Sequence, residues 1–267
     1  MNWFRRILLF VLVPVVVSAC STPVVDEVYQ AQGQDSRIRY IVLHYTAGDA
    51  EEALQELTRQ QVSAHYLITD ESPVRVLQLV DDNERAWHAG ESQWRNDVNL
   101  NFSSIGIEIV NLGPLSHAGT VPTSQDDWQP YKGEQIDRLI RLVKVLQQRY
   151  HIRNENILGH SDIAPQRKID PGPVFPWRWL AQEGVGRWYD ETRVARLTAV
   201  FQQQGLPSSE WVQQKLRKIG YAIEETGEWD EQSKRVLRAF QMHYRPSSFD
   251  GRLDAETAAI LEDLTQP

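Results

Sequence analysis

Cysteine is almost absent from this chain. Cys20 is the only one in 267 residues, so no internal disulfide can form and stability must come from the apolar core. Positive charge is also in short supply, because 28 Lys and Arg residues stand against 36 Asp and Glu residues and the formal net charge is −8. A chain of this charge has no overall field that attracts polyanions. We therefore expect no nucleic-acid partner.

The chain also lacks an apolar run long enough to remain in a membrane. The run at residues 7–17 is shorter than the roughly 20 residues that a spanning helix needs, and Pro14 interrupts it. Arg5 and Arg6 precede this run, and Ser18 and Ala19 follow it, which is the layout of a secretory signal peptide. We predict that residues 1–19 are a signal peptide that is removed.

The end of this leader resembles a bacterial lipobox, since Val17-Ser18-Ala19 leads directly into Cys20. The resemblance implies that Cys20 is acylated and anchors the protein to a membrane. Ser21 stands where an Asp would favour retention in the inner membrane, so the predicted location is the outer membrane, facing the periplasm. The alternative is an unmodified thiol in an ordinary secretory leader.

The remaining chain is long enough for two domains, because a domain usually has about 100 to 200 residues. Residues 20–37 are polar without an apolar period and are predicted to form a tether. Residues 38–190 mix strand and helix patterns, whereas residues 191–267 show only short helical periods. We predict an α/β domain over 38–190 and a small all-α domain over 191–267.

Apolar spacing predicts the elements of the first domain. An amphipathic helix is expected over 136–146, where it should cover the sheet, and a shorter helix near 53–57. Strands are expected over the segments 38–43, 66–68, 74–80, 105–110 and 156–159.

Two histidines stand at the ends of predicted strands. His44 follows the first strand and His160 follows the last. An α/β protein usually gathers its active site where strands end at one edge of the sheet. Asp170 precedes a proline, which favours an extended backbone, and in an extended segment Lys168 and Asp170 point the same way. These side chains would bring two imidazoles, a carboxylate and a cation to one pocket.

Two imidazoles and one carboxylate are a known catalytic zinc set that leaves a fourth position for water. Amide hydrolysis also requires a base and a group that stabilises the oxyanion. Glu108 could be the base, because it faces away from the alternating isoleucines of its strand, and Lys168 could stabilise the oxyanion.

Other roles for these residues stay open, because the three ligands are far apart in sequence and form no local motif such as HExxH. His44 and His160 could be ordinary strand-end histidines. Asp170 could be a turn former, and Glu108 an exposed strand residue.

Five segments carry a family resemblance: IVLHYTA at 41–47, VSAHY at 62–66, AWHAG at 86–90, SIGIE at 104–108 and GHSDIAPQRKIDPGP at 159–173. In this order they resemble the N-acetylmuramoyl-L-alanine amidases of the amidase-2 family, over residues 38–182. The resemblance implies a central mixed β-sheet flanked by helices. It also implies hydrolysis of the amide between N-acetylmuramic acid and L-alanine in peptidoglycan or its fragments.

The same resemblance implies roles for individual residues. His44, His160 and Asp170 would bind one zinc ion per chain, Glu108 would activate water and Lys168 would stabilise the intermediate. Trp87 and His88 would line the substrate groove, although an aromatic side chain after a strand is more often part of the core; His65 is similarly ambiguous. Ala64 departs from relatives that place a catalytic tyrosine there, so Glu108 would have to do that work.

The helical end of the chain resembles a three-helix peptidoglycan-binding module, on the segments VQQKL at 212–216, IGY at 219–221, AFQ at 239–241 and DGRLDAET at 250–257. Such a module would raise the local substrate concentration; the alternative is that these helices only pack against the rest of the protein and bind nothing.

We expect a monomer that acts on peptidoglycan or muropeptides. The competing hypotheses are a non-catalytic peptidoglycan-binding lipoprotein and a structural tether between membrane and wall. His117, His151 and His243 match no motif and are expected at the surface.

Overall fold

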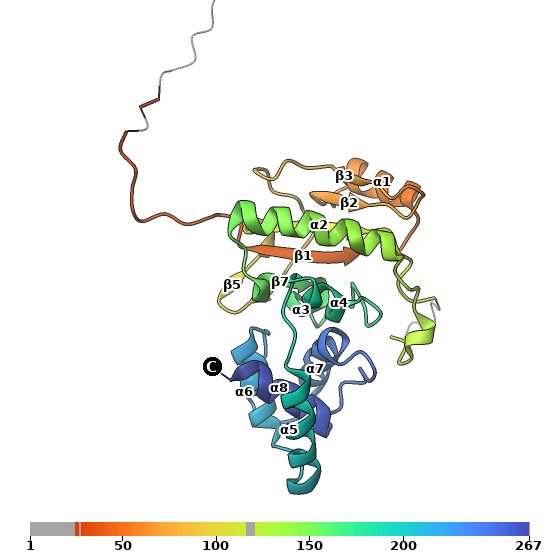
Figure 1. Cartoon of the computed structure of the whole chain (residues 1–267), viewed down its shortest axis with the longest axis vertical. Helices are drawn as coiled ribbons and strands as arrows, with labels where there is room; N and C mark the ends of the chain where they lie inside the picture. The colour runs from red at the N-terminus through yellow and green to blue at the C-terminus, as the bar shows by residue number, and fades with distance from the viewer. Residues whose placement is uncertain (1–24, 27, 116–120, 267) are drawn as a thin grey trace, which may run out of the picture. The chain divides into compact units, whose positions relative to one another are not determined.

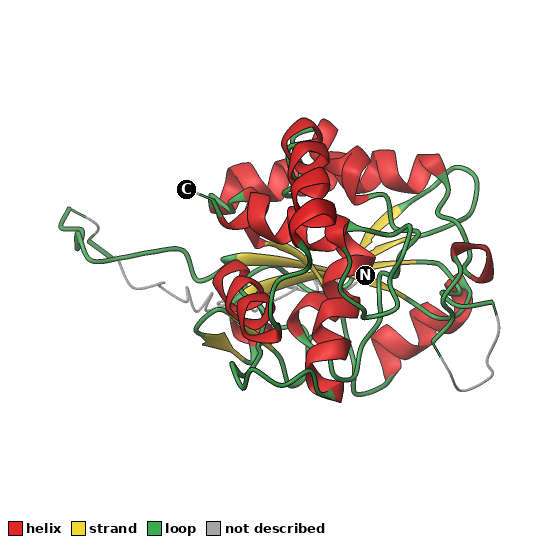
Figure 2. Ribbon diagram, turned by 90° about the horizontal axis from the view of Figure 1, so that it is seen from below, coloured by secondary structure: helices red, strands yellow, loops and turns green. Residues whose placement is uncertain are grey.

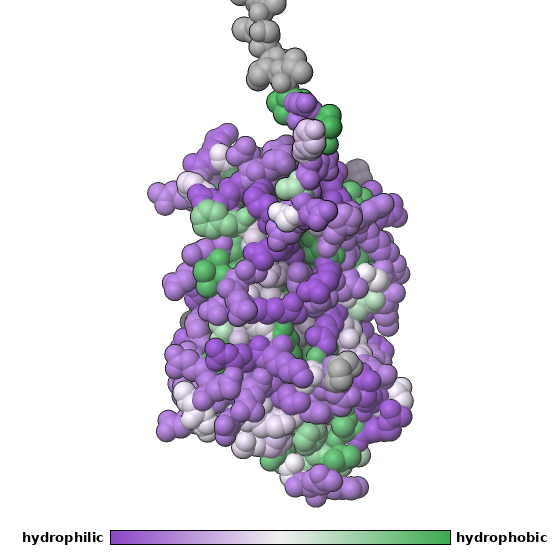
Figure 3. Space-filling view, turned by 90° about the vertical axis from the view of Figure 1, so that its left-hand side faces the viewer, coloured by the Kyte–Doolittle hydropathy of each residue, from purple (hydrophilic) through white to green (hydrophobic). Residues whose placement is uncertain are grey.

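The computed structural model describes residues 25, 26, 28–115 and 121–266. The predicted signal peptide, Cys20 and His117 therefore lie outside the described residues. The chain divides into two units, Met1–Asp35 and Ser36–Pro267, and every helix and strand of the described residues belongs to the second. Across the described residues, every helix is too short or too polar to cross a membrane. The face drawn in Figure 3 is mostly hydrophilic, with apolar residues in separate patches.

A five-stranded mixed sheet forms the centre of this unit, in the order β3-β2-β6-β1-β7. The strands β2, β6, β1 and β7 are parallel, and β3 is antiparallel to β2. The predicted mixed sheet is thus confirmed. The strand bounds are β1 Tyr40–Tyr45, β2 Tyr66–Ile68, β3 Val76–Gln78, β6 Ser104–Ile109 and β7 Ile157–Gly159.

Helix α2, Gly133–Tyr150, lies across one face of the sheet (Figure 1). Its apolar stripe packs in one core with the side chains of β1 and β6 that alternate toward it, as the sequence pattern predicts. The core members from these three elements are Ile136, Leu139, Ile140, Val143, Leu146, Ile41, Leu43, Ile105, Ile107 and Ile109. His44 of β1 and Glu108 of β6 alternate to the other face of the sheet.

That other face carries α1, Ala50–Arg59, toward the β2 side of the sheet. Asp49 caps this helix by accepting hydrogen bonds from the backbone N–H groups of Glu51 and Glu52, which satisfies two donors that the helix itself leaves free. Ala53 packs with Leu67 of β2 in a small separate core.

Short elements that the sequence did not predict complete this part of the fold. Helix α3, His160–Ile163, follows β7 directly, and α4, Trp177–Gln182, comes after the Pro-rich segment. Strands β4, Gln93–Trp94, and β5, Asp97–Val98, pair in an antiparallel hairpin. A 3-10 turn, η2, spans Gln125–Asp127.

Four helices make up the C-terminal part: α5 Glu191–Gln204, α6 Ser209–Ile219, α7 Glu231–Tyr244 and α8 Ala255–Thr265 (Figures 1 and 2). Their apolar side chains do not form a separate core. They belong to one cluster with Tyr40 and Val42 of β1 and Leu158 of β7. The helices therefore stabilise the sheet on the face opposite α2.

The prediction that His243 lies at the surface is wrong. Its side chain is 3% exposed, and its ring stacks on Trp177 with a centroid distance of 3.8 Å. The Nδ1 atom lies 2.8 Å from the Asp162 carboxyl group. His243 faces α3 and α4, which the sequence pattern did not reveal, so its burial could not be predicted. His151, by contrast, is exposed as expected.

Candidate active site

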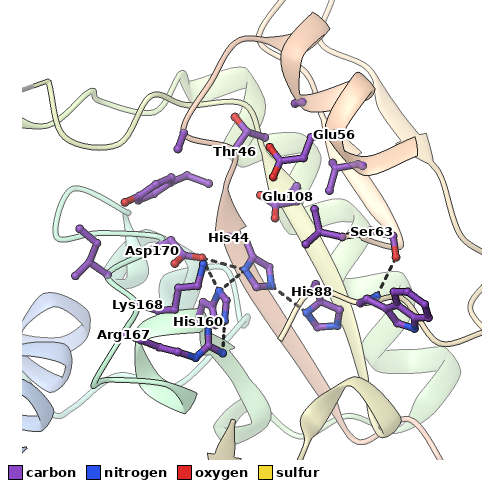
Figure 4. Close-up of a pocket in the computed structure, with 17 residues that line it drawn as sticks. His44, Thr46, Glu56, Ser63, His88, Glu108, His160, Arg167, Lys168 and Asp170 are labelled. Carbon is purple, nitrogen blue, oxygen red and sulfur yellow. Dashed lines mark hydrogen bonds and ion pairs between the residues drawn. The ribbon is translucent and has the colours of Figure 1, made fainter. Parts of the chain in front are cut away.

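The sheet register brings His44 and Glu108 side by side. They are partners in the parallel pair of β1 and β6, near the carboxyl ends of both strands, and so their side chains emerge from the same face. His44 lies inside β1, one residue before its end, rather than after the strand as predicted. His160 begins α3 directly after β7, which pairs with β1 on the other side. Three chemically active residues therefore meet at one edge of the sheet (Figure 4).

Three ligand atoms converge in a buried cluster. The Nδ1 atoms of His44 and His160 are 3.0 Å apart, and they lie 2.9 Å and 3.0 Å from Oδ2 of Asp170. The backbone N–H of Ser161 donates to the Asp170 carbonyl oxygen at 2.8 Å, which holds the Asp170 segment against the start of α3. The structure thus brings all three predicted metal ligands together, in a geometry that could hold one ion.

The cluster fits a zinc ion. Zinc ligands at about 2.0–2.2 Å in a tetrahedron are separated by about 3.3 Å, close to the separations observed here. The Nε2 atom of His160 lies 3.1 Å from the Ala89 carbonyl oxygen and 3.3 Å from a guanidinium nitrogen of Arg167, so Nε2 faces away from the cluster and Nδ1 faces into it. With Nδ1 free of a proton, His160 and Asp170 can each give a lone pair to one shared cation.

The surroundings keep these ligands in the protonation states that metal binding requires. Burial and the neighbouring His160 ring lower the pKa of His44 to about 4, so its imidazole is neutral at neutral pH. Burial by itself would raise the pKa of Asp170. The adjacent His160 and His44 imidazoles outweigh that effect and hold the pKa of Asp170 well below its usual range, so the group is a carboxylate.

Glu108 is partly buried, and its Oε2 atom is buried without a hydrogen-bond partner among the described residues. Burial raises the pKa of Glu108 well above its usual value; the Asp170 carboxylate raises it further, and the Lys168 cation opposes the rise. An unpartnered carboxyl group of raised pKa is a stronger proton acceptor than an exposed one.

Glu108 and Lys168 both line an open pocket of about 470 Å³ above the ligand cluster. The pocket also contains residues that the sequence did not single out, including Glu56 of α1 and Arg167. A signal for Arg167 existed, because it immediately precedes Lys168 in the longest matching segment. No such signal existed for Glu56, because an acidic residue on an amphipathic helix usually lies on the face exposed to solvent.

Trp87 and His88, predicted together as groove residues, are placed very differently. Both line the pocket. The Trp87 side chain is 51% exposed at the rim, where its backbone N–H donates to Ser63 Oγ at 2.9 Å. His88 is only 9% exposed and lies beneath the pocket against His44. His65 is also buried, and its Nδ1 accepts from the Gly106 N–H at 3.0 Å.

Comparison with known proteins shows what this geometry is similar to. Residues 34–173 match the family described as N-acetylmuramoyl-L-alanine amidase, and residues 206–261 match a putative peptidoglycan binding domain. N-acetylmuramoyl-L-alanine amidase AmiD of Escherichia coli K12 is 44% identical over 242 residues, which cover 89% of this chain and 86% of that protein. This chain belongs to the N-acetylmuramoyl-L-alanine amidase family.

Solved structures of amidases share the whole architecture. AmpDh3 from Pseudomonas aeruginosa superimposes with a TM-score of 0.83 at 40% identity and covers 91% of this chain and 98% of its own. The E. coli AmiD complex with anhydro-N-acetylmuramic acid-L-Ala-D-gamma-Glu-L-Lys gives a TM-score of 0.78 at 42% identity, with 90% and 93% covered. The predicted family and fold are confirmed. Amidases of this family depend on zinc, and the His44, His160 and Asp170 cluster supplies a matching donor set.

Proposed function

We propose that this amidase hydrolyses the amide between N-acetylmuramic acid and L-alanine in peptidoglycan fragments, with one zinc ion held by His44, His160 and Asp170. The convergence of these three donor atoms beside the unpartnered carboxyl group of Glu108 carries the proposal. It is supported by relatives solved with muramyl peptides, namely E. coli AmiD with its tripeptide substrate and AmpDh3 with anhydromuramic pentapeptide.

Zinc, when bound, would supply the Lewis acidity that makes water and an amide carbonyl more reactive. Glu108 is placed to accept a proton from the attacking water, because its free Oε2 atom belongs to a pocket-lining carboxylate on the strand next to His44. Water oxygen adds to the carbonyl carbon and the carbon–nitrogen bond breaks. The proton held by Glu108 then passes to the departing nitrogen of L-alanine. The products are the muramic acid carboxylate and a peptide with a free amino terminus.

Lys168 is placed to stabilise the negative charge that develops on the carbonyl oxygen. It lines the same pocket as Glu108, two residues before Asp170, so its cation belongs to the segment that also supplies a ligand. A preorganised cation facing developing charge is worth a large part of a hydrolase's rate enhancement. A passive peptidoglycan binder would have no use for this cation, a free base and three converging ligands in one pocket.

The C-terminal helices are proposed to bind peptidoglycan, in line with the family match over 206–261. Binding there would raise the concentration of substrate near the pocket. The interaction would be measured by sedimentation of the full chain with purified cell-wall sacculi. Loss of binding on removal of the helices would not be interpretable, because they share a core with β1.

Membrane attachment is proposed from sequence alone. Cleavage before Cys20 and its acylation would place a monomer on the outer membrane, facing the periplasm. The test is incorporation of labelled palmitate and membrane fractionation of the wild type and the Cys20→Ala variant, with size-exclusion chromatography of the extracted protein. Equal label in both proteins would refute acylation at Cys20.

The catalytic proposal is tested on a purified muramyl tripeptide. The zinc-loaded full chain should release free tripeptide, identified by mass spectrometry, and the anhydro and reducing forms of the sugar should be compared. Glu108→Gln keeps the size of the side chain and removes its charge, so it should still bind one zinc ion per chain without measurable release. Release at the wild-type rate by Glu108→Gln would show that the base is assigned wrongly.

A further inference from the structure

Two consecutive residues contact both metal-ligand imidazoles from behind. His88 Nδ1 lies 3.0 Å from His44 Nε2, and the Ala89 carbonyl oxygen lies 3.1 Å from His160 Nε2. Each contact involves the ring nitrogen that faces away from the ligand cluster. The Nε2 atom of His160 lies between that carbonyl, which can only accept, and a guanidinium nitrogen of Arg167 at 3.3 Å, which can only donate. The contact between His44 and His88 joins two imidazoles, each of which can donate or accept. The direction of this hydrogen bond, that is, which ring is the donor, follows from the other hydrogen bond that His88 makes, to Ser104.

Ser104 gives that direction. Its Oγ atom lies 2.6 Å from the Leu100 carbonyl oxygen and 3.1 Å from His88 Nε2. A hydroxyl has one proton, and only donation to the carbonyl avoids two acceptors in contact, so Ser104 accepts from the Nε2–H group of His88. His88 has no hydrogen-bonded carboxylate among the described residues and is nearly buried, so its ring is neutral and its Nδ1 atom is bare. His44 must then donate through Nε2–H, which leaves its own Nδ1 bare and facing Asp170.

The space for the His88 ring is built into β6. A Cβ atom on Gly106 would lie 2.3 Å from Cγ of His88, so only glycine leaves room for the ring on this face of the strand. Ser104 is two residues earlier on the same face, and Glu108 two residues later. The strand thus carries in succession the acceptor for His88, the space for its ring and the catalytic carboxylate.

The backbone of His88 and Ala89 is also held in place by hydrogen bonds. The Oδ1 atom of Asn101 accepts from the N–H groups of His88 and Ala89, at 3.1 Å and 2.7 Å. Asn101 belongs to the 3-10 turn η1, Leu100–Phe102, which also supplies the carbonyl that orients Ser104. One turn therefore holds the backbone of both residues and fixes the proton position behind His44.

We infer that His88 is a positioning residue of the metal site, which fixes His44 in the tautomer that presents Nδ1 to zinc, and is not a residue that binds substrate. Ser104, Gly106 and Asn101 seat it in that role. The inference rests on the proposed zinc-dependent function. Ligand histidines commonly donate their second N–H to a carboxylate or a carbonyl, and such partners affect metal affinity. Here a neutral imidazole takes that place and adds no negative charge behind His44.

The test is zinc affinity of the full chain, measured by competition with a chromophoric chelator. His88→Ala should weaken zinc binding by roughly 10- to 100-fold, the usual effect of losing such a partner. His88→Asn places a carbonyl oxygen near the former Nδ1 position and should recover part of that loss. Trp87→Ala, on the neighbouring exposed side chain, is the control and should keep wild-type zinc affinity.

A substrate-binding role gives the opposite pattern. If His88→Ala raised KM for the muramyl tripeptide and kept wild-type zinc affinity, the inference would be overturned, while the proposed function would stand. Failure of the wild type to bind zinc or to release tripeptide would instead refute the proposed function.

Two further measurements do not depend on the folding of His88→Ala. Ser104→Ala removes only the oriented hydroxyl and should weaken zinc binding less than His88→Ala but measurably. Nitrogen NMR of the wild-type, zinc-loaded protein should show both His44 and His88 with the proton on Nε2 alone. A substantial population with the proton on Nδ1 of either ring, or wild-type zinc affinity in Ser104→Ala, would contradict the inference.

Discussion

The Nδ1 atom of His243 lies 2.8 Å from Oδ2 of Asp162, a residue two positions after the metal ligand His160. The same carboxyl group accepts from the Tyr221 hydroxyl at 2.6 Å and from the Gly159 N–H at 2.7 Å. His243 and Tyr221, both from the C-terminal helical part, therefore contact the buried Asp162 carboxyl group. Asp162 lies in the short helix α3, which begins with the metal ligand His160. The helices are joined to the active site through this group.

We predict that Tyr221→Phe destabilises the whole unit. The variant leaves the Asp162 carboxyl group short of one buried donor, so the free energy of unfolding should fall by about 1–3 kcal/mol. Urea unfolding of the full chain would measure the change. Tyr189→Phe is a matched control on a partly buried tyrosine of the same core, whose hydroxyl bonds to no described residue. Equal stability of the two variants would refute a role for the Tyr221 hydroxyl.

Asp170→Asn should remove zinc without unfolding the protein. The amide keeps the size of the side chain, but it loses the charge that balances a cation between two neutral imidazoles. We expect zinc affinity at least about 10-fold lower than in the wild type, measured by chelator competition. Glu108→Gln is the matched control, because it changes a carboxylate in the same pocket that is not a ligand. Unaltered affinity in Asp170→Asn would exclude the residue as a ligand.

Lys168→Met should change the pH dependence of the reaction. The Lys168 cation lowers the pKa of Glu108, so its removal lets that pKa rise further. Glu108 accepts a proton only when ionised; the acidic limb of kcat/KM should therefore move to higher pH. The plateau should fall by roughly 100- to 1,000-fold as oxyanion stabilisation is lost. Lys168→Arg keeps the charge and should leave the limb in place. A limb that does not move in Lys168→Met would show that Lys168 does not act on Glu108.

Gly106→Ala should damage the site from within the sheet. The new Cβ atom would occupy the place of the His88 ring, which must shift away from His44 and Ser104. Overpacking of this kind costs about 1–3 kcal/mol, and zinc affinity should fall together with stability. Thermal unfolding with and without zinc would separate the two effects. A variant that loses neither would mean that the ring moves freely at this position.

Much of the fold followed from apolar spacing. The strand that became β6 and the helix that became α2 were found because their apolar side chains repeat with the period of the element and face one core. The same spacing could not reveal α3 or the β4–β5 hairpin, because four residues make little more than one helical turn and two residues complete a single strand period, so no repeat is visible.

The ligands could be predicted because strand ends and a proline restrict where His44, His160 and Asp170 point. The role inferred for His88 could not be predicted, since it depends on the hydroxyl direction of Ser104 and on the space above Gly106. Neither the direction of a hydroxyl group nor the space above a glycine can be recognised from a sequence pattern. His243 was misjudged for a related reason: its partner Asp162 is 81 residues away, and its burial arises only when two distant parts of the chain share a core.

Gly220 packs so closely on Trp94 that an added Cβ atom would lie 2.5 Å from the indole ring. The carbonyl of Gly220 also accepts from the Arg95 N–H at 2.7 Å. With no free space at this contact, the C-terminal helices cannot shift against the β4–β5 hairpin. If these helices bind peptidoglycan as proposed, the bound polymer and the pocket stand in one fixed spatial relation.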